Sequence, residues 1–119
     1  MNMKKIILFL TIFLSACTGH YEADDFNLDA LNKIAPSLFE LNTENGQVEV
    51  QWWPEEIQAL KPKLVKSQKD GIYIVLDSIF ISESGIFIPR EKTVVVTGKD
   101  YDPSYILLGG NVYSYHIKG

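Results

Sequence analysis

A ten-residue run in the middle of the chain limits the possible folds more than any other feature. Nearly every residue from Ile72 to Ile81 (IYIVLDSIFI) is apolar or β-branched. Such a run is typical of a strand that is covered on both faces of a sheet. The polar pair Asp77–Ser78 marks a place where the strand can bend. We therefore expect this run to form the central strand of a β-sheet.

Further strand candidates flank this run and are separated from it by short turn signals. Lys63–Lys66 precedes it across Lys69–Asp70–Gly71, which suits a hairpin loop. We expect Glu83–Ser84–Gly85 to turn the chain after it. The later strand candidates are Ile86–Ile88, Thr93–Thr97 and Val112–Ile117, the last entered through Gly109–Gly110–Asn111. Short connections between sequence neighbours favour antiparallel pairing.

The residues before the sheet favour helices. One apolar stripe at steps of three and four predicts a helix, which Asp25 or Asn27 can cap: Leu28, Leu31, Ile34, Leu38 and Leu41. Pro36 interrupts it and leaves open whether residues 37–41 are helix or strand. Alternation over Gln47–Gln51 indicates a half-exposed strand or extended segment, and Glu55–Leu60 is expected to form a short helix. The predicted fold is α+β: an antiparallel sheet of about four to six strands with one or two N-terminal helices packed on one face.

The first 16 residues have the pattern of a secretory signal peptide. Lys4 and Lys5 are followed by a nine-residue apolar run, Ile6–Leu14 (IILFLTIFL), and then by small residues. The run is too short to span a bilayer, which takes about 20 apolar residues in a helix. We expect a cleaved export signal rather than a permanent transmembrane anchor.

Leu14–Ser15–Ala16–Cys17 resembles the lipobox of bacterial lipoproteins. The resemblance implies a diacylglyceryl group on the Cys17 thiol, cleavage before Cys17 and acylation of the new N-terminus, so that acyl chains such as palmitate hold the protein on a membrane. The alternative is an ordinary signal peptide with an incidental Cys. Since Thr18 rather than Asp follows Cys17, the resemblance implies an outer-membrane protein facing the periplasm if the source is Gram-negative. The expected organisation is a signal peptide (1–16), a lipidated Cys with a tether (17–25) and one domain (26–119).

Charge is distributed unevenly along the 119 residues. The full chain has a net charge of −4, and removal of residues 1–16 leaves nine basic and 15 acidic residues, a net charge of −6. An acidic chain of this kind is not expected to bind nucleic acid. Residues 20–60 carry −8 and residues 61–119 carry +2. We favour neighbouring halves that partly neutralise each other over a dedicated charged binding face.

The residues that catalysis requires are sparse. A single Cys excludes an internal disulfide and a multi-Cys zinc cluster, and no His or Cys pair has metal-ligand spacing. His20 is expected in the tether and His116 in a structural role, so we expect no catalytic residue, no metal and no cofactor. A competing enzyme or small-ligand binder would need converging polar groups, for which the candidates are Asp77, Asp100, Asp102 and His116.

Aromatic residues are the better candidates for a binding surface. Trp52 and Trp53 are adjacent, so an extended backbone would bury one and expose the other. Exposed Trp and Tyr often anchor protein interfaces, which makes Trp52, Trp53 and Tyr101 the partner-binding candidates. The expected function is a non-catalytic envelope lipoprotein that binds a protein, for example a toxin as an immunity protein does. The alternative is an envelope ligand binder or enzyme.

Overall fold

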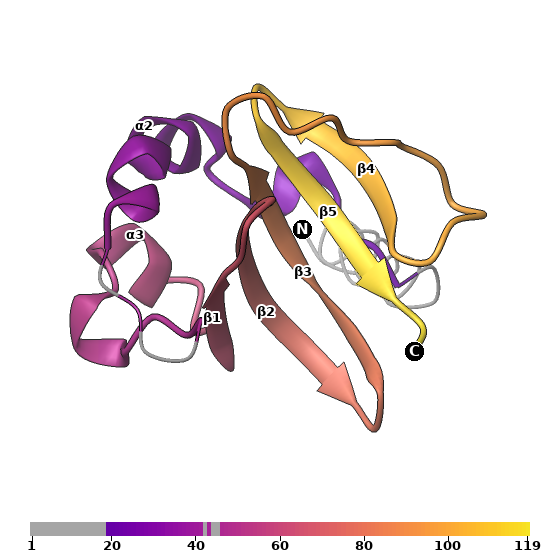
Figure 1. Cartoon of the computed structure of the whole chain (residues 1–119), viewed down its shortest axis with the longest axis horizontal. Helices are drawn as coiled ribbons and strands as arrows, with labels where there is room; N and C mark the ends of the chain where they lie inside the picture. Colours follow the sequence, from indigo (N-terminus) through magenta and orange to yellow (C-terminus); the bar gives the residue numbers. More distant parts are fainter. Residues whose placement is uncertain (1–18, 42, 44–45) are drawn as a thin grey trace, which may run out of the picture.

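A computed structural model of the chain describes residues 19–41, 43 and 46–119. Within these ranges, five antiparallel strands form one sheet in the order β1-β2-β3-β5-β4, and two α-helices come before it in the sequence (Figure 1). The predicted α+β class and strand number are confirmed. The predicted signal peptide and Cys17 lie outside the described residues. The strands are β1 (Leu64–Ser67), β2 (Gly71–Ile79), β3 (Ser82–Pro89), β4 (Ser104–Gly109) and β5 (Val112–Ile117).

The central hairpin of the sheet is longer than the sequence indicated. β2 and β3 pair as far as Ile79 and Ser82, so the chain turns at Phe80–Ile81. The predicted turn at Glu83–Ser84–Gly85 is wrong, because these residues pair with β2 on one side and β5 on the other. The register shifts between Val75 and Asp77, which is where a bend was expected.

The prediction of a strand at Thr93–Thr97 is also wrong. The segment between β3 and β4 has no strand, and its only ladder contact is an isolated bridge between Gly98 and Tyr105. The Thr93 hydroxyl donates a hydrogen bond to the Asp70 carbonyl, and Val95 packs against an aromatic cluster on the sheet. The segment therefore contacts a sheet face and does not extend the sheet beyond β4.

Helix α2 (Leu28–Phe39) forms where the apolar stripe predicted a helix. The Asn27 side chain accepts a hydrogen bond of 3.2 Å from the Ala30 N–H, so Asn27 is the N-cap. Pro36 lies at an exposed position inside the helix, and the chain stays helical through Phe39. Residues 37–39 are therefore helix, and Glu40 caps the end.

Between α2 and β1 the structure describes residues 46–63 without a break. Gln47 forms an isolated bridge to Lys66, and the chain then enters a 3-10 turn, η2 (Val50–Trp52). The predicted extended segment over Gln47–Gln51 is thus correct only at its beginning. Helix α3 (Glu55–Gln58) is confirmed, although it is shorter than predicted.

Two apolar clusters pack on the opposite faces of the sheet. Ile72 and Ile74 of β2 face Ile88 and Ile86 of β3, and these isoleucines share one cluster with buried residues of both helices: Leu31, Ala35, Leu38 and Ile57. Alternation along the strands places the second cluster on the other face: Tyr73, Phe87 and Tyr115. The arrangement of the helices as a whole on one face stays a prediction.

The described residues before α2, from Gly19 onward, pack against the sheet. His20 is buried and bonded to serines of β4 and β5, and Ala23–Asp25 forms a 3-10 turn, η1. The expectation that His20 lies in a free tether is therefore wrong, because its ring finds partners on the sheet. No helix among the described residues has the length and apolarity needed to cross a membrane.

Candidate functional site

The structure separates the two tryptophans as predicted, although by a 3-10 turn rather than an extended backbone. Trp52 lies in η2 with 51% of its surface exposed, and Val50 in the same turn is 63% exposed. Trp53 packs against the isoleucine cluster, and its Nε1 donates a hydrogen bond of 2.9 Å to the Val48 carbonyl. Trp53 therefore holds the 3-10 turn against the core through this packing and this hydrogen bond. Val50 and Trp52 form an exposed apolar surface that we call the tryptophan turn.

Acidic side chains surround the tryptophan turn in the sequence. Glu49, Glu55 and Glu56 are all exposed. The ion pairs of the described residues lie elsewhere: Lys63 with Asp77 at 3.6 Å and Lys66 with Glu83 at 2.8 Å.

In both ion pairs the two partners belong to residues 61–119, the half of the chain with a charge of +2. The expected neutralisation of the acidic half by the basic half is therefore not found as ion pairs between side chains that the structure describes. The carboxylates next to the tryptophan turn form no ion pair with any side chain of the described residues.

Tyr101 lies in a different place. It is exposed in the segment between β3 and β4 and lines a hollow of about 350 Å³ with Asp70, Phe87 and Tyr105. This hollow belongs to the aromatic face of the sheet. The structure thus does not bring Tyr101 together with Trp52 in one surface.

A cluster of histidines and serines occupies one end of the isoleucine face. The His20 ring lies 2.8 Å from both Ser114 Oγ, at Nδ1, and Ser104 Oγ, at Nε2. His116 Nδ1 lies 2.9 Å from Ser84 Oγ, and the two imidazole rings are 6.1 Å apart. These residues come from the N-terminal segment and three strands, so their hydrogen bonds fasten that segment to the sheet.

The hydrogen bonds around His20 suit a neutral ring. The Tyr21 N–H donates to Ser114 Oγ, and Ser104 Oγ donates to the His116 carbonyl. The Ser114 hydroxyl is then left to donate to His20 Nδ1, and Ser104 accepts from Nε2–H. Burial, followed by the charges of His116 and Lys99, lowers the pKa of His20 to about 4. His20 is therefore uncharged near neutral pH.

A pocket of about 560 Å³ lies beside this cluster. Its wall combines polar and apolar side chains: Tyr21, Phe26, Leu60, Leu76, Asp77 and Ser84 are among them. The Ser84 hydroxyl and both His20 nitrogens that face it already have partners within the protein. A ligand in this pocket would contact these bonded groups together with the side chains of Tyr21 and Asp77.

The four polar groups named for an enzyme do not converge. Asp77 lines the pocket beside His20, whereas Asp102 lines the hollow at Tyr101 and accepts a hydrogen bond from the Lys118 N–H. His116 bonds Ser84, and no hydrogen bond joins any two of Asp77, Asp100, Asp102 and His116. The residues the structure describes contain no group of three or more His, Cys, Asp or Glu arranged to hold a metal.

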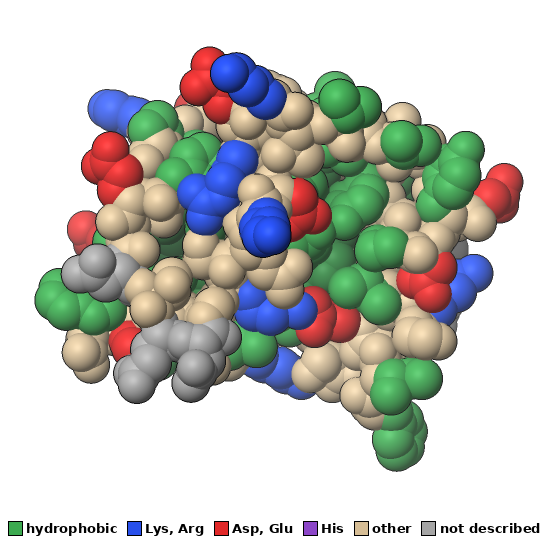
Figure 2. All heavy atoms as spheres, in the orientation of Figure 1, with side chains coloured by type: hydrophobic (Ala, Val, Ile, Leu, Met, Phe, Trp, Pro, Cys, Tyr) green, Lys and Arg blue, Asp and Glu red, His purple; other side chains and the backbone are tan. Residues whose placement is uncertain are grey.

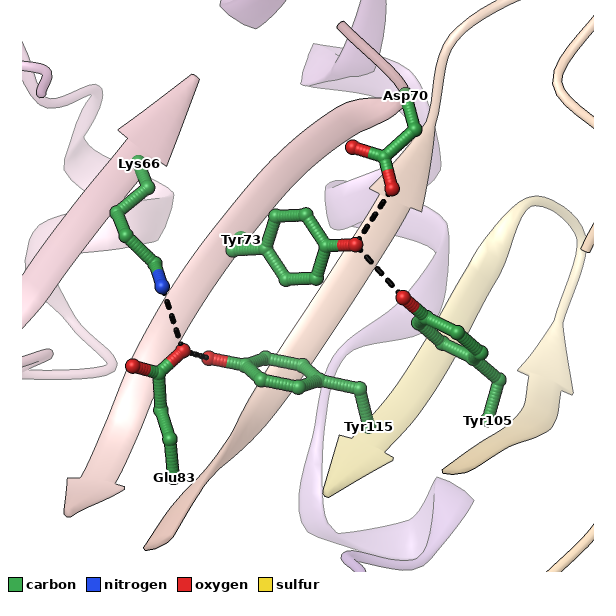
Figure 3. A network of polar contacts seen from close by, with 6 residues as sticks. All are labelled: Lys66, Asp70, Tyr73, Glu83, Tyr105 and Tyr115. Carbon is green, nitrogen blue, oxygen red and sulfur yellow. Dashed lines mark hydrogen bonds and ion pairs between the residues drawn. The ribbon is translucent and has the colours of Figure 1, made fainter. Parts of the chain in front are cut away.

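Two chains of hydrogen bonds cross the aromatic face (Figure 3). Tyr105 and Tyr73 hydroxyls are 2.7 Å apart, and Tyr73 donates to Asp70 at 2.6 Å. In the second chain, Glu83 Oε2 accepts from Tyr115 and Lys66, each at 2.8 Å. The figure shows that these side chains span the strands of the sheet.

The tyrosines of this network are held as neutral donors. Burial, together with a hydrogen bond to a carboxylate, raises the pKa of Tyr73 and of Tyr115 far above the ordinary value for tyrosine. A neutral phenol hydrogen-bonded to a carboxylate is neither a nucleophile nor a general base. The first chain links β2 and β4 through Tyr73 and Tyr105, and the second links three strands, β1, β3 and β5, through Lys66, Glu83 and Tyr115.

Comparison with known proteins adds no relative: no protein-family model, no curated protein and no solved structure matches this chain. The candidate functions must therefore be argued from the residues themselves.

Sequence reasoning missed three features of the molecule, the first of which is strand β4 (Ser104–Gly109), since no strand was predicted there. Ile79, Phe80 and Ile81 were assigned to a buried strand, but all three are exposed at the end of the β2–β3 hairpin. Apolarity alone does not separate a buried strand from an exposed apolar turn, and no Gly or Asn marks the turn. The partners of His20 lie 84 and 94 residues away in the sequence, so no local pattern predicts them.

Proposed function

We propose that this chain is a bacterial envelope lipoprotein that is anchored through Cys17 and binds another protein, without catalysing a reaction. The anchor is supported by the lipobox-like residues Leu14–Cys17. Acyl chains on Cys17 would hold the domain at the outer membrane, facing the periplasm, if the source is Gram-negative.

The observation that carries the binding proposal is the tryptophan turn. An exposed indole next to an exposed Val and bordered by unpaired carboxylates has the composition of an interface anchor with a charged rim. The complementary partner surface has a small apolar depression surrounded by Lys and Arg. A basic toxin neutralised by an immunity lipoprotein is one partner of this kind.

The enzyme or ligand-binding alternative has a pocket, but the candidate polar groups do not converge in it. Asp77 lines the 560 Å³ pocket, whereas Asp102 lines the hollow beside Tyr101. The pocket residues His20 and Ser84 are already bonded to neighbouring strand residues: Ser104, Ser114 and His116. A binding surface therefore accounts for more of the exposed features than a catalytic site does.

The test is a comparison of proteins that co-purify with the full chain after mild detergent extraction of membranes. Trp52→Ala removes the indole, Glu49→Lys reverses a neighbouring charge, and Leu107→Ala is the matched control, since Leu107 is 53% exposed on β4. Loss of an interface anchor residue costs about 2 kcal/mol, which weakens binding about 30-fold.

We expect one partner to be lost from both variants at the tryptophan turn and kept by the control. A partner retained by Trp52→Ala, or lost equally from Leu107→Ala, contradicts the assignment of the surface. High salt is expected to weaken the complex, because the rim is charged.

A further inference from the structure

The end of the β2–β3 hairpin is the most exposed apolar part of the described chain. Phe80 is fully exposed, and Ile79 and Ile81 on either side of it are exposed as well. Figure 2 shows hydrophobic atoms protruding at the lower right, at the place where Figure 1 draws this turn. We call these three residues the hairpin tip. A protruding apolar segment of this kind marks a contact with another phase or molecule.

The backbone of the hairpin tip is unfavourable for the residue it carries. Phe80 has φ +57°, a left-handed conformation that two-residue hairpin turns normally give to Gly or Asn. A bulky side chain there adds strain, and its full exposure shows no packing that would offset it. A strained residue whose side chain makes no packing contact within the domain points to a contact that the side chain makes outside the domain.

The hairpin tip lies at the same end of the sheet as the predicted anchor. Gly19 packs against the His116 ring, where an added Cβ would lie 2.7 Å from Nδ1. His116 pairs with Ser84, which lies two residues after β3 begins at Ser82, next to the turn of the hairpin. Cys17 is two residues before Gly19, and two residues reach at most about 7 Å. The acyl chains would therefore leave the domain near the end from which the hairpin projects.

The charges around the hairpin tip do not oppose a membrane. The two carboxylates in the last residues of the hairpin each have a lysine partner: Asp77 pairs with Lys63, and Glu83 with Lys66. Lys118 is exposed immediately after the residue that pairs with Glu83, and the nearby Asp102 carboxylate accepts a hydrogen bond from the Lys118 N–H. Paired acids and an exposed cation beside an apolar turn suit the headgroup region of an anionic bilayer.

From these observations we propose that the hairpin tip inserts into the surface of the bilayer that holds the acyl chains. Phe80 enters the boundary between headgroups and acyl chains, with Ile79 and Ile81 beside it. This second contact fixes the orientation of the domain, whereas acyl chains at a single residue would leave the domain free to rotate about that point. The inference rests on the proposed anchor at Cys17, since the anchor supplies the bilayer.

The main experiment places an environment-sensitive dye on a single new thiol in the full chain, purified and reconstituted into anionic phospholipid vesicles. Cys17 is the only natural Cys, and acylation would consume its thiol. One variant carries Ser82→Cys, next to the hairpin tip. The matched control carries Val94→Cys, at an apolar residue that is 87% exposed on another part of the surface.

We expect blue-shifted emission from the dye at residue 82 and quenching by nitroxides on lipid acyl chains but not by aqueous iodide. The dye at residue 94 is expected to show the reverse. Iodide quenching of the dye at residue 82 in vesicles, or its protection only after a second protein is added, overturns the membrane assignment. The latter result would make the hairpin tip a protein contact.

A second measurement separates this inference from the anchor. Mass spectrometry of the same samples reports acylation of Cys17, so a water-exposed tip on acylated protein refutes the inference alone. In the unacylated Cys17→Ser background, Phe80→Ser is expected to lower vesicle partitioning about tenfold or more relative to Val94→Ser. Equal partitioning of the two variants contradicts insertion, even where the anchor is confirmed.

Discussion

His20 is expected to make the stability of the domain depend on pH. Its ring is buried between Ser104 and Ser114, and the resulting desolvation lowers its pKa from 6.5 to about 4. The folded state therefore binds the His20 proton less readily than the unfolded state does. The stabilisation is complete above pH 6.5 and is lost as the pH falls toward 4.

The size of this effect follows from the difference in pKa. A shift of one unit is worth about 1.4 kcal/mol, so His20 alone should lower the free energy of unfolding by about 3 kcal/mol between pH 7 and pH 4. This is a large share of the 5–15 kcal/mol that is usual for a domain. Carboxylates also titrate in this range, so the contribution of His20 must be taken as a difference between variants.

The variant His20→Gln isolates the contribution, because glutamine keeps polar atoms for the serines but does not titrate. At pH 7 we expect it to be less stable than the wild type by about 1–3 kcal/mol, since buried hydrogen bonds are impaired. The two free energies should converge as the pH is lowered to 4. Urea unfolding of the full chain in nonionic detergent, followed by tryptophan fluorescence at several pH values, measures both. A gap that stays constant from pH 7 to pH 4 would refute the reasoning.

Three further predictions concern the free energy of unfolding at pH 7, measured by the same urea method. Phe80→Gly should raise it by about 1 kcal/mol, because Gly relieves the left-handed backbone and no packing is lost; a decrease would contradict the strain at this turn. Gly85→Ala should lower it by about 3 kcal/mol or more, because the new Cβ would lie 1.9 Å from the Ile74 carbonyl oxygen; wild-type stability would disprove this close approach. Tyr115→Phe should lower it by about 2 kcal/mol through loss of the 2.8 Å hydrogen bond to Glu83, and an unchanged value would show that this bond contributes nothing.

Local patterns were sufficient for much of the fold. The Leu28–Leu38 stripe, with a cap at Asp25 or Asn27, predicted α2, and Lys69–Asp70–Gly71 predicted the first hairpin, because each signal lies within a few residues. The adjacent tryptophans were correctly divided into a packed and an exposed residue.

The errors occurred where distant contacts decide the outcome. Thr93–Thr97 has the composition of a strand, but Val95 packs against the aromatic cluster and Thr93 bonds Asp70, so the segment does not pair along the sheet. His20 has no local signal, since both of its serine partners come from the last 16 residues of the chain. The turn at Phe80 contains no Gly, Asn or Asp, the residues that two-residue hairpin turns favour. The apolar sequence there therefore has the pattern of the end of a strand.

The most direct test of the account is whether Cys17 carries lipid. Cells that express the full chain would be labelled with radioactive palmitate, and the protein would be recovered from the membrane and soluble fractions in wild-type and Cys17→Ala forms. We predict label on the wild-type protein in the membrane fraction, an N-terminus that begins at Cys17, and no label on Cys17→Ala. Label that persists in the variant, or wild-type protein that retains residues 1–16 with a free Cys17 thiol, would contradict the account.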